Sequence, residues 1–295
     1  MPLPYRHLTS VLLRREGELF LFDCGEGTQV SLKRLNLRWK KINAIFISHT
    51  HADHVTGLPG LLMLSSQVDR DEPLYIYGPP KIAEYVETSR RVLDMYINYE
   101  IIVKEISAPC VVHAGDGFYI RAFPLFHTKT CIGYTLEELP RPGEFNPDSA
   151  AALGVPRGPL WSKLQHGQSV IASNGETVLP EQVVGSARSG RKFSFVTDSL
   201  YDTSIAGEVK GSDLLICEAM FAANEKDQAA EKKHMTSIQS ATIARDANAK
   251  NLALIHYSPR YIDRELPLLQ NEAQTVFKNT SLCRDRMVFT IPYED

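Results

Sequence analysis

The sequence lacks the cysteine pairs that hold together disulfide-rich proteins or cysteine-bound zinc proteins. Its five cysteines are odd in number, scattered along the chain and never spaced as C-x-x-C. This usage fits a reducing compartment and argues against both a disulfide framework and structural zinc bound by cysteine. No apolar run is long enough to span a membrane, and the first residues lack the charged-then-apolar pattern of a signal peptide. We therefore expect a cytoplasmic protein with no membrane partner.

The sequence also lacks a strong excess of charge, internal repeats and low-complexity tracts. Its net charge is -3 and its isoelectric point is near 6.3. These values give no sign of a nucleic-acid partner, although a local basic patch would be enough to bind one. With 295 residues, of which 43% are hydrophobic, the chain can bury a large core in one or two domains.

Strand and helix patterns alternate along most of the chain. Short apolar runs bounded by turn residues predict strands at residues 8–13, 19–22, 44–48, 74–77, 192–197, 213–217 and 252–255. Amphipathic or leucine-rich stretches predict helices at residues 28–35, 57–67, 82–95 and 237–247. This alternation indicates an α/β fold.

Residues 138–192 interrupt this alternation. Prolines crowd into their first part, at positions 140, 142, 147, 156 and 159, with glycines among them. Because proline disrupts helix interiors and central strands, the segment is predicted to be a loop-rich excursion without a packed helix. From position 157 to position 192 it carries five basic and two acidic residues, a net charge of 5 - 2 = +3. That is a modest basic patch.

The densest cluster of metal-binding side chains lies directly after the apolar segment 44–47. His49, His51, Asp53 and His54 fall within six residues. Side chains alternate along a strand, so His49 and His51 are expected to point the same way. Imidazole nitrogens and a carboxylate oxygen suit zinc, and also manganese or iron. The run can supply most of the ligands of two adjacent metal ions.

Three more candidate ligands stand at or just beyond the ends of predicted strands. His127 and His256 each follow an apolar segment directly. Asp198 follows the predicted strand 192–197. Strand ends are where α/β proteins gather functional groups. A single histidine in such a position is commonly an ordinary surface or hydrogen-bonded residue. Taken together with the histidine run, the three are candidate ligands.

The chain resembles the metallo-β-lactamase superfamily and, within it, the ribonuclease Z family. The resemblance is carried by the ligand series His49, His51, Asp53, His54, His127, Asp198 and His256. Further stretches similar to family signatures are residues 22–29, 57–61, 154–161, 234–236 and 256–261. The resemblance implies an αββα sandwich as a single domain over residues 1–295, with residues 138–192 inserted as a flexible, tRNA-binding arm.

The same resemblance implies a division of the ligands between two zinc ions per subunit, with manganese or iron as alternatives. His49, His51 and His127 would bind one ion. Asp53, His54 and His256 would bind the other. Asp198 would bridge the pair.

The implied activity is a zinc-dependent endoribonuclease that removes 3′ trailers from precursor tRNA and leaves a tRNA 3′-hydroxyl. The implied assembly is a homodimer in which the arm of one subunit grips tRNA cleaved by its partner. A small-molecule phosphodiesterase, or another hydrolase on the same scaffold, is the alternative. A non-catalytic RNA-binding protein is a third possibility, which the complete ligand set disfavours.

Three catalytic residues are expected from this resemblance. Asp53 would act as general base as well as ligand. His234 would protonate the leaving 3′-oxygen, although it could instead be a surface histidine in a lysine-rich turn. Glu218 would orient His234 and raise its pKa, although it could instead be a satisfied carboxylate at a strand end.

RNA contacts are expected from Arg6, Arg157 and Lys163. Arg6 belongs to an early basic element in which the family usually has a lysine and an asparagine. This sequence has Pro4 and His7 at those two positions. This difference from the family concerns the residues expected to hold the RNA beyond the cleavage site.

Overall fold

The structure is a computed structural model that describes residues 3–37, 39–67 and 70–294. They form two compact units. The larger unit, here called the body, comprises the described residues up to Gly115, then Tyr119–Leu136 and Lys192–Ile291. The smaller unit, here called the arm unit, comprises Asp116–Phe118, Glu137–Arg191 and the chain from Pro292 onward.

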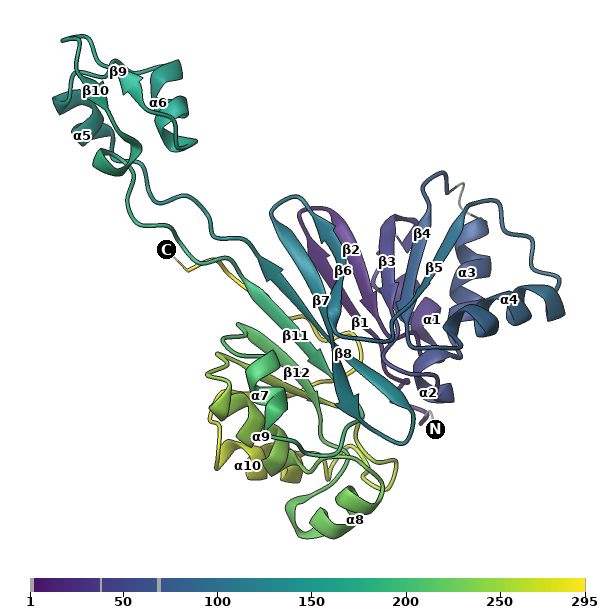
Figure 1. The fold of residues 1–295 in the computed structure, drawn as a ribbon. Coiled ribbons are helices and arrows are strands. Elements are labelled where there is room, and N and C mark those ends of the chain that lie inside the picture. Colours follow the sequence, from purple (N-terminus) through teal and green to yellow (C-terminus); the bar gives the residue numbers. More distant parts are fainter. Residues whose placement is uncertain (1–2, 38, 68–69, 295) are drawn as a thin grey trace. The chain divides into compact units, whose positions relative to one another are not determined.

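The body contains two β-sheets (Figure 1). The first has the strand order β1 (Val11–Arg15), β2 (Glu18–Phe22), β3 (Ile42–Phe46), β4 (Leu74–Gly78), β5 (Ile101–Glu105). The second has the order β14 (Thr280–Leu282), β13 (Leu252–Ile255), β12 (Leu214–Glu218), β11 (Lys192–Val196), β8 (Thr130–Glu138), β7 (Phe118–Phe126), β6 (Cys110–Gly115). Strands β2 to β5 and β11 to β14 run parallel, so their carboxyl ends share one edge of each sheet.

Aromatic side chains join the two sheets face to face. The Phe22 ring in the first sheet lies 5.2 Å from the Phe193 ring and 5.7 Å from the Phe195 ring in the second. Phe46 lies 5.4 Å from Tyr134 in the same way. All five side chains are buried. Central strands such as β2, β3 and β12 therefore present one apolar face to the partner sheet and the other to a helical layer, which explains why they are apolar on both faces.

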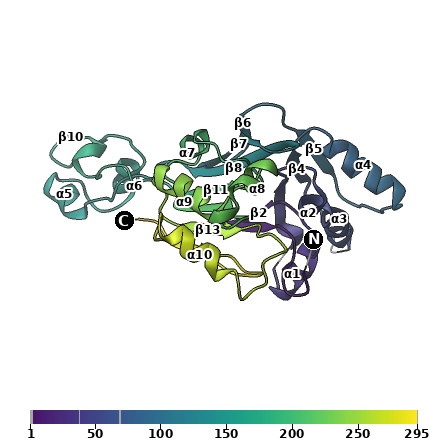
Figure 2. The same cartoon turned by 90° about the horizontal axis from the view of Figure 1, so that it is seen from below.

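Helices cover the outer faces of both sheets (Figure 2). Those packed on the first sheet are α1 (Thr28–Arg34), α3 (Leu58–Ser66) and α4 (Ile82–Val92). Those packed on the second are α7 (Ser204–Glu208), α9 (Ser237–Asp246) and α10 (Pro267–Gln274). The remaining short helices of the body are α2 (Ala52–Val55), α8 (Lys226–Glu231), η1 (Trp39–Lys41) and η3 (Ala223–Glu225). This arrangement confirms the predicted αββα sandwich.

Helix α9 shows how local sequence positions an element of the fold. The Thr236 hydroxyl oxygen accepts a hydrogen bond from the backbone N–H of Gln239, and Gln239 Oε1 accepts one from the backbone N–H of Thr236, so a capping box starts the helix. The face turned to the sheet carries small residues, which let the helix approach β12 closely. Ser240 Oγ on that face donates a 2.5 Å hydrogen bond to the carbonyl of Glu218. The end of β12 is thereby fixed.

His49 and His51 do point toward each other, with His49 Nε2 2.9 Å from His51 Nδ1, but the strand that was predicted to set their directions ends earlier. Strand β3 ends at Phe46, so His49 and His51 lie in a loop, and strand alternation does not set their directions. The Asp23 carboxylate accepts bonds from both the backbone N–H and the hydroxyl of Ser48, at 2.7 and 2.8 Å. These bonds divert the chain from the sheet before the first histidine.

The arm unit contains more secondary structure than the sequence predicted. It contains α5 (Pro147–Ala152), α6 (Pro159–Gln165), β9 (Val170–Ile171), β10 (Thr177–Val178) and η2 (Pro180–Gln182). The prolines were read as barriers to a packed helix, but Pro147 and Pro159 stand in the first turn of α5 and α6, where no N–H is needed. A small apolar core holds these pieces together, made of Ala150, Val155, Leu164, Val170, Ala172, Val178 and Val183.

Within the part of the chain that the structure describes, no helix combines the length and apolar character needed to cross a membrane.

Candidate metal centre

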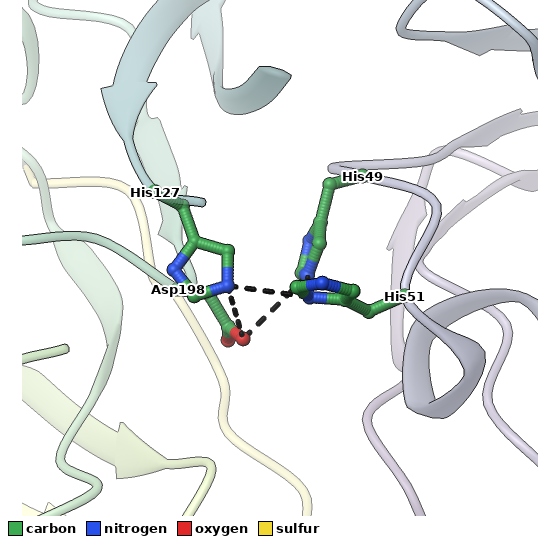
Figure 3. A group of neighbouring side chains, drawn as sticks. All are labelled: His49, His51, His127 and Asp198. Atoms are coloured by element: carbon green, nitrogen blue, oxygen red, sulfur yellow. Dashed lines mark hydrogen bonds and ion pairs between the residues drawn. The ribbon is translucent and has the colours of Figure 1, made fainter. Parts of the chain in front are cut away.

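The structure brings the predicted ligands together, although they come from separate parts of the sequence. His49, His51, His127 and Asp198 offer ligand atoms that all lie within 4.8 Å of one another (Figure 3). His127 directly follows β7, and Asp198 comes two residues after β11. Sequence reasoning predicted these strand ends as the source of ligands.

Distances within this first group match those expected around one cation. His51 Nδ1 lies 2.9 Å from His49 Nε2 and 3.2 Å from His127 Nε2. Asp198 Oδ2 lies 3.5 Å from His49 Nε2 and 3.7 Å from His127 Nε2. Ligand atoms at ~2.0–2.1 Å from a tetrahedral zinc lie roughly 3.4 Å apart, so the four groups can share an ion.

A second group lies on the other side of Asp198. Asp53 Oδ2 is 3.5 Å from His54 Nε2 and 3.2 Å from His256 Nε2. Asp198 Oδ1 is 3.5 Å from His54 Nε2 and 3.2 Å from His256 Nδ1. The two carboxylate oxygens of Asp198 thus face different groups, which is the arrangement of a bridging ligand.

Two buried nitrogens of the second group support a cation there. Nε2 of His54 and Nδ1 of His256 lie 3.2–3.5 Å from carboxylate oxygens but make no hydrogen bond of good geometry among the described residues. Leaving a buried polar atom unpaired costs about 1–3 kcal/mol, a penalty that coordination to a cation removes. The donor set of imidazole nitrogens and carboxylate oxygens suits zinc, manganese or iron. The histidine–aspartate cluster is therefore compatible with a metal site.

Asp23 supports the cluster and was not assigned a role from the sequence. Its Oδ2 lies 2.6 Å from Nδ1 of His54, which turns Nε2 of that ring toward Asp53 and Asp198. Asp23 is fully buried and has a left-handed backbone, with φ 55°. The only sequence signal was its place in the glycine-rich turn of the first family signature. Such supporting carboxylates fix the tautomer and direction of metal-binding histidines.

Other ring nitrogens are also fixed. His127 Nδ1 lies 2.9 Å from the carbonyl of Lys233, and His49 Nδ1 lies 3.0 Å from Oγ of Ser48. In both rings the opposite nitrogen is the one that faces Asp198. The orientation of these side chains is therefore set by protein contacts.

Protonation states of several of these groups suit cation binding, whereas for His54 burial is outweighed by Asp198 and Asp23, which raise its pKa. Burial, helped by the neighbouring His54, lowers the pKa of His49 to about 2, and burial also lowers the pKa of His127. Burial raises the pKa of Asp53, but hydrogen bonds from His256 and His54 outweigh it and leave that pKa well below its usual value. Neutral imidazoles and ionised carboxylates are the forms that coordinate metals.

His256 has an unusual backbone that is held by contacts from elsewhere. Its φ of 56° lies in the left-handed region, which a non-glycine residue adopts only when surrounding structure supports it. Arg6 Nη2 donates bonds of 3.2 and 3.3 Å to the carbonyls of Ser258 and Tyr261, in the loop that follows. The partly buried Arg6 therefore anchors this loop, and its role in RNA binding stays a prediction.

His234 and Glu218 form a pair beside the cluster. Nδ1 of His234 is 3.2 and 3.1 Å from the two oxygens of Glu218, and 4.0 Å from Oδ2 of Asp198. Burial lowers the pKa of His234, but Glu218 and then Asp198 outweigh it, so the pKa is raised. Burial raises the pKa of Glu218, although His234 opposes this. The geometry suits the predicted orienting role, which stays a prediction, as does the acid role of His234.

Arg157 and Lys163 belong to the arm unit. Both are exposed, Arg157 just before α6 and Lys163 within it. Their side chains are therefore accessible to a partner, and their part in RNA binding stays a prediction.

The architecture and the ligand cluster define a metallo-β-lactamase fold with a candidate metal site. A metallo-β-lactamase fold protein from Bacillus subtilis, YhfI, matches with a TM-score of 0.66 and 20% identity, over 96% of this chain and 91% of that chain. The crystal structure of human tRNase Z, short form, matches with a TM-score of 0.71 and 27% identity, over 99% of this chain and 95% of that chain.

Proteins with similar sequences identify the family within this fold class. Ribonuclease Z of Treponema denticola is 68% identical over 100% of this chain and 96% of its own length. Ribonuclease Z of Methanosarcina acetivorans is 40% identical over 99% of this chain and 95% of its own length. A family model described as anti-Pycsar protein Apyc1 matches residues 5–113, less than half of the chain. The chain belongs to the ribonuclease Z family.

Proposed function

We propose that this protein is a metal-dependent endoribonuclease that removes 3′ trailers from precursor tRNA and leaves a 3′-hydroxyl on the tRNA. The observation that carries the proposal is the position of Asp198, whose two oxygens face two separate ligand groups in a chain of the ribonuclease Z family. A paired site of this kind suits phosphodiester hydrolysis, in which both the attacking and the leaving oxygen need stabilisation.

The proposed ligand assignment follows the two groups. His49, His51 and His127 hold one ion, Asp53, His54 and His256 hold the other, and Asp198 is shared. The proposed ions are two zinc ions per subunit, with manganese or iron as alternatives. When bound, such ions lower the pKa of a water molecule and neutralise charge on the phosphate.

The chain's own groups then handle the protons. Asp53 is ionised, so its carboxylate can accept a proton from the attacking water as general base. His234, with its raised pKa, can hold a proton on its ring and donate it to the ribose 3′-oxygen that leaves. Buried Glu218 keeps the imidazole in place through Nδ1, which leaves Nε2 as the donating atom.

The arm unit is proposed as the tRNA grip. Its exposed basic residues, including Arg157 and Lys163, suit contact with a phosphate backbone. The proposal includes the homodimer implied by the family resemblance, in which the arm of one subunit holds tRNA cleaved by the other. It also includes a cytoplasmic location, which the five free cysteines support.

The test is cleavage of a precursor tRNA that carries a 3′ trailer, with the mature tRNA body as control substrate. We expect a single cut that releases the trailer and leaves a 3′-hydroxyl on the tRNA. Bis(p-nitrophenyl) phosphate serves as a small phosphodiester in parallel. Hydrolysis of this small ester without cleavage of the precursor would support the small-molecule phosphodiesterase instead and refute the proposal.

A further inference from the structure

Two chain segments of the arm unit run antiparallel and are here called the stalk, residues 138–143 and 185–191. Arg141 and Arg188 exchange backbone hydrogen bonds of 2.8 and 2.9 Å, and the N–H of Glu138 donates to the carbonyl of Arg191 at 2.9 Å. A two-stranded ribbon by itself is only marginally stable in water. The stalk therefore needs support from elsewhere to keep one conformation.

Glycine lets the two segments approach closely at the far end of the stalk. A Cβ atom at Gly143 would lie 1.9 Å from the carbonyl oxygen of Gly185. At the other end, a Cβ at Gly190 would lie 2.3 Å from the carbonyl oxygen of Glu138. Close contact at both ends brings the side chains between them within reach of a common partner.

That partner is the C-terminal tail of the chain. The ring of Tyr293 lies between two guanidinium groups, with Arg141 Cζ 3.7 Å and Arg191 Cζ 3.8 Å from its centroid. The two arginines come from different segments of the stalk. An aromatic ring stacked on both therefore links the segments, and each contact is attractive because a cation favours the π face of a ring.

Hydrogen bonds add to this link. Arg191 Nη2 donates to the Tyr293 hydroxyl at 2.9 Å and to Oε1 of Glu138 at 2.7 Å. The Tyr293 hydroxyl in turn donates to the same Glu138 oxygen at 3.4 Å. Arg141 Nη2 donates to the carbonyl of Glu294 at 3.0 Å. The tail thus contacts both segments through the side chain and the backbone.

We propose that Tyr293 is a positioning residue that locks the stalk of the arm and so prepares the arm unit to bind precursor tRNA. The inference rests on the proposed function of the arm. A binding element that is already ordered loses less conformational freedom when it binds. Tyr293 would therefore act on substrate affinity and leave the chemical step unchanged.

Substitution of Tyr293 tests this with three variants. Tyr293→Ala removes the ring, Tyr293→Leu keeps apolar bulk without a π face, and Tyr293→Phe keeps the ring without the hydroxyl. From the strength of cation–π contacts we expect Tyr293→Ala and Tyr293→Leu to raise KM for precursor tRNA by roughly 3- to 30-fold. We expect kcat, metal content and hydrolysis of bis(p-nitrophenyl) phosphate to stay within about twofold, and Tyr293→Phe to restore most of the affinity.

Amide hydrogen exchange gives an independent readout. Loss of the ring should speed exchange at residues 138–143 and 185–191, because the stalk opens more often. Unchanged exchange there, or an unchanged KM in a folded Tyr293→Ala protein, would overturn the proposal. If the wild-type protein cleaved no precursor tRNA, the proposed function would fail, whereas the exchange experiment would still decide whether Tyr293 locks the stalk.

Discussion

Nδ1 of His234 lies 3.1 Å from the fully buried carboxylate of Glu218. Glu218 is the last residue of β12, and its Oε1 also accepts a 2.6 Å bond from the backbone of Ser199. The position of the Glu218 carboxylate is therefore fixed by contacts other than the one with the imidazole. A charge held in this way can keep a histidine protonated and pointed at a substrate, which is what a general acid needs.

Replacing His234 by alanine should separate proton donation from metal binding. We expect kcat for precursor tRNA to fall by about 10²- to 10⁴-fold, the range for loss of a general acid. Bound metal should stay at the wild-type level. Hydrolysis of bis(p-nitrophenyl) phosphate should fall much less, because p-nitrophenolate leaves without a proton. Loss of metal from the variant would make His234 a ligand and contradict the acid role.

Removing the charge of Glu218 should change the pH dependence of cleavage. The raised pKa of His234 depends on this carboxylate, after burial has acted in the opposite direction. A general acid works when protonated, so activity is present below its pKa and lost as pH rises through it. In Glu218→Gln we therefore expect the alkaline loss of kcat/KM to occur at lower pH than in the wild type. Exposed Glu231, changed to Gln, is the control, and an unshifted profile in Glu218→Gln would contradict the pairing.

Asp23 should matter for metal affinity although it contacts no proposed ion. Asp23→Asn weakens the 2.6 Å contact that orients His54. Loss of such a supporting group typically lowers metal affinity about 10- to 100-fold. Competition with a chromophoric chelator measures the change, and Asp246→Asn, at an exposed position on α9, is the matched control. Equal affinity in Asp23→Asn and wild type would show that His54 needs no such support.

The candidate ligands could be predicted from the sequence for a physical reason. His127 and His256 each follow a strand directly, and strands can be recognised locally from their apolar runs. For His256, the parallel neighbours of β13 then bring the carboxyl ends of the strands together. The end of β3 was less predictable, because the bonds from Ser48 to Asp23 that divert the chain join residues 25 positions apart.

The long-range contact that anchors the loop after His256 could not be predicted. The contact of Arg6 with Ser258 joins residues 252 positions apart, and no local pattern encodes it. The arm was expected to be loop-rich because its prolines were read as helix breakers. Pro147 and Pro159 begin helices instead, and the small core around Leu164 became visible only in three dimensions.

Substitution of the exposed basic residues of the arm should weaken binding of precursor tRNA without affecting hydrolysis of a small phosphodiester. We expect Arg157→Ala combined with Lys163→Ala to raise KM for precursor tRNA. The slope of log affinity against log salt concentration should also become shallower, by about one unit for each phosphate that is no longer neutralised. Turnover of bis(p-nitrophenyl) phosphate should be unchanged. The measurement is KM at several salt concentrations. An unaltered slope would mean that neither side chain binds phosphate.

The most direct test of the central claim is zinc titration of protein that has been stripped by a chelator. Bound zinc is measured by mass spectrometry, and cleavage of a precursor tRNA with a 3′ trailer is measured at each step. We expect that the stripped protein does not cleave and that full activity returns as two zinc ions bind each subunit. We also expect that Asp198→Ala never regains activity, because the shared carboxylate is missing. Trailer removal by the stripped protein, or full activity in Asp198→Ala, would contradict a two-metal mechanism.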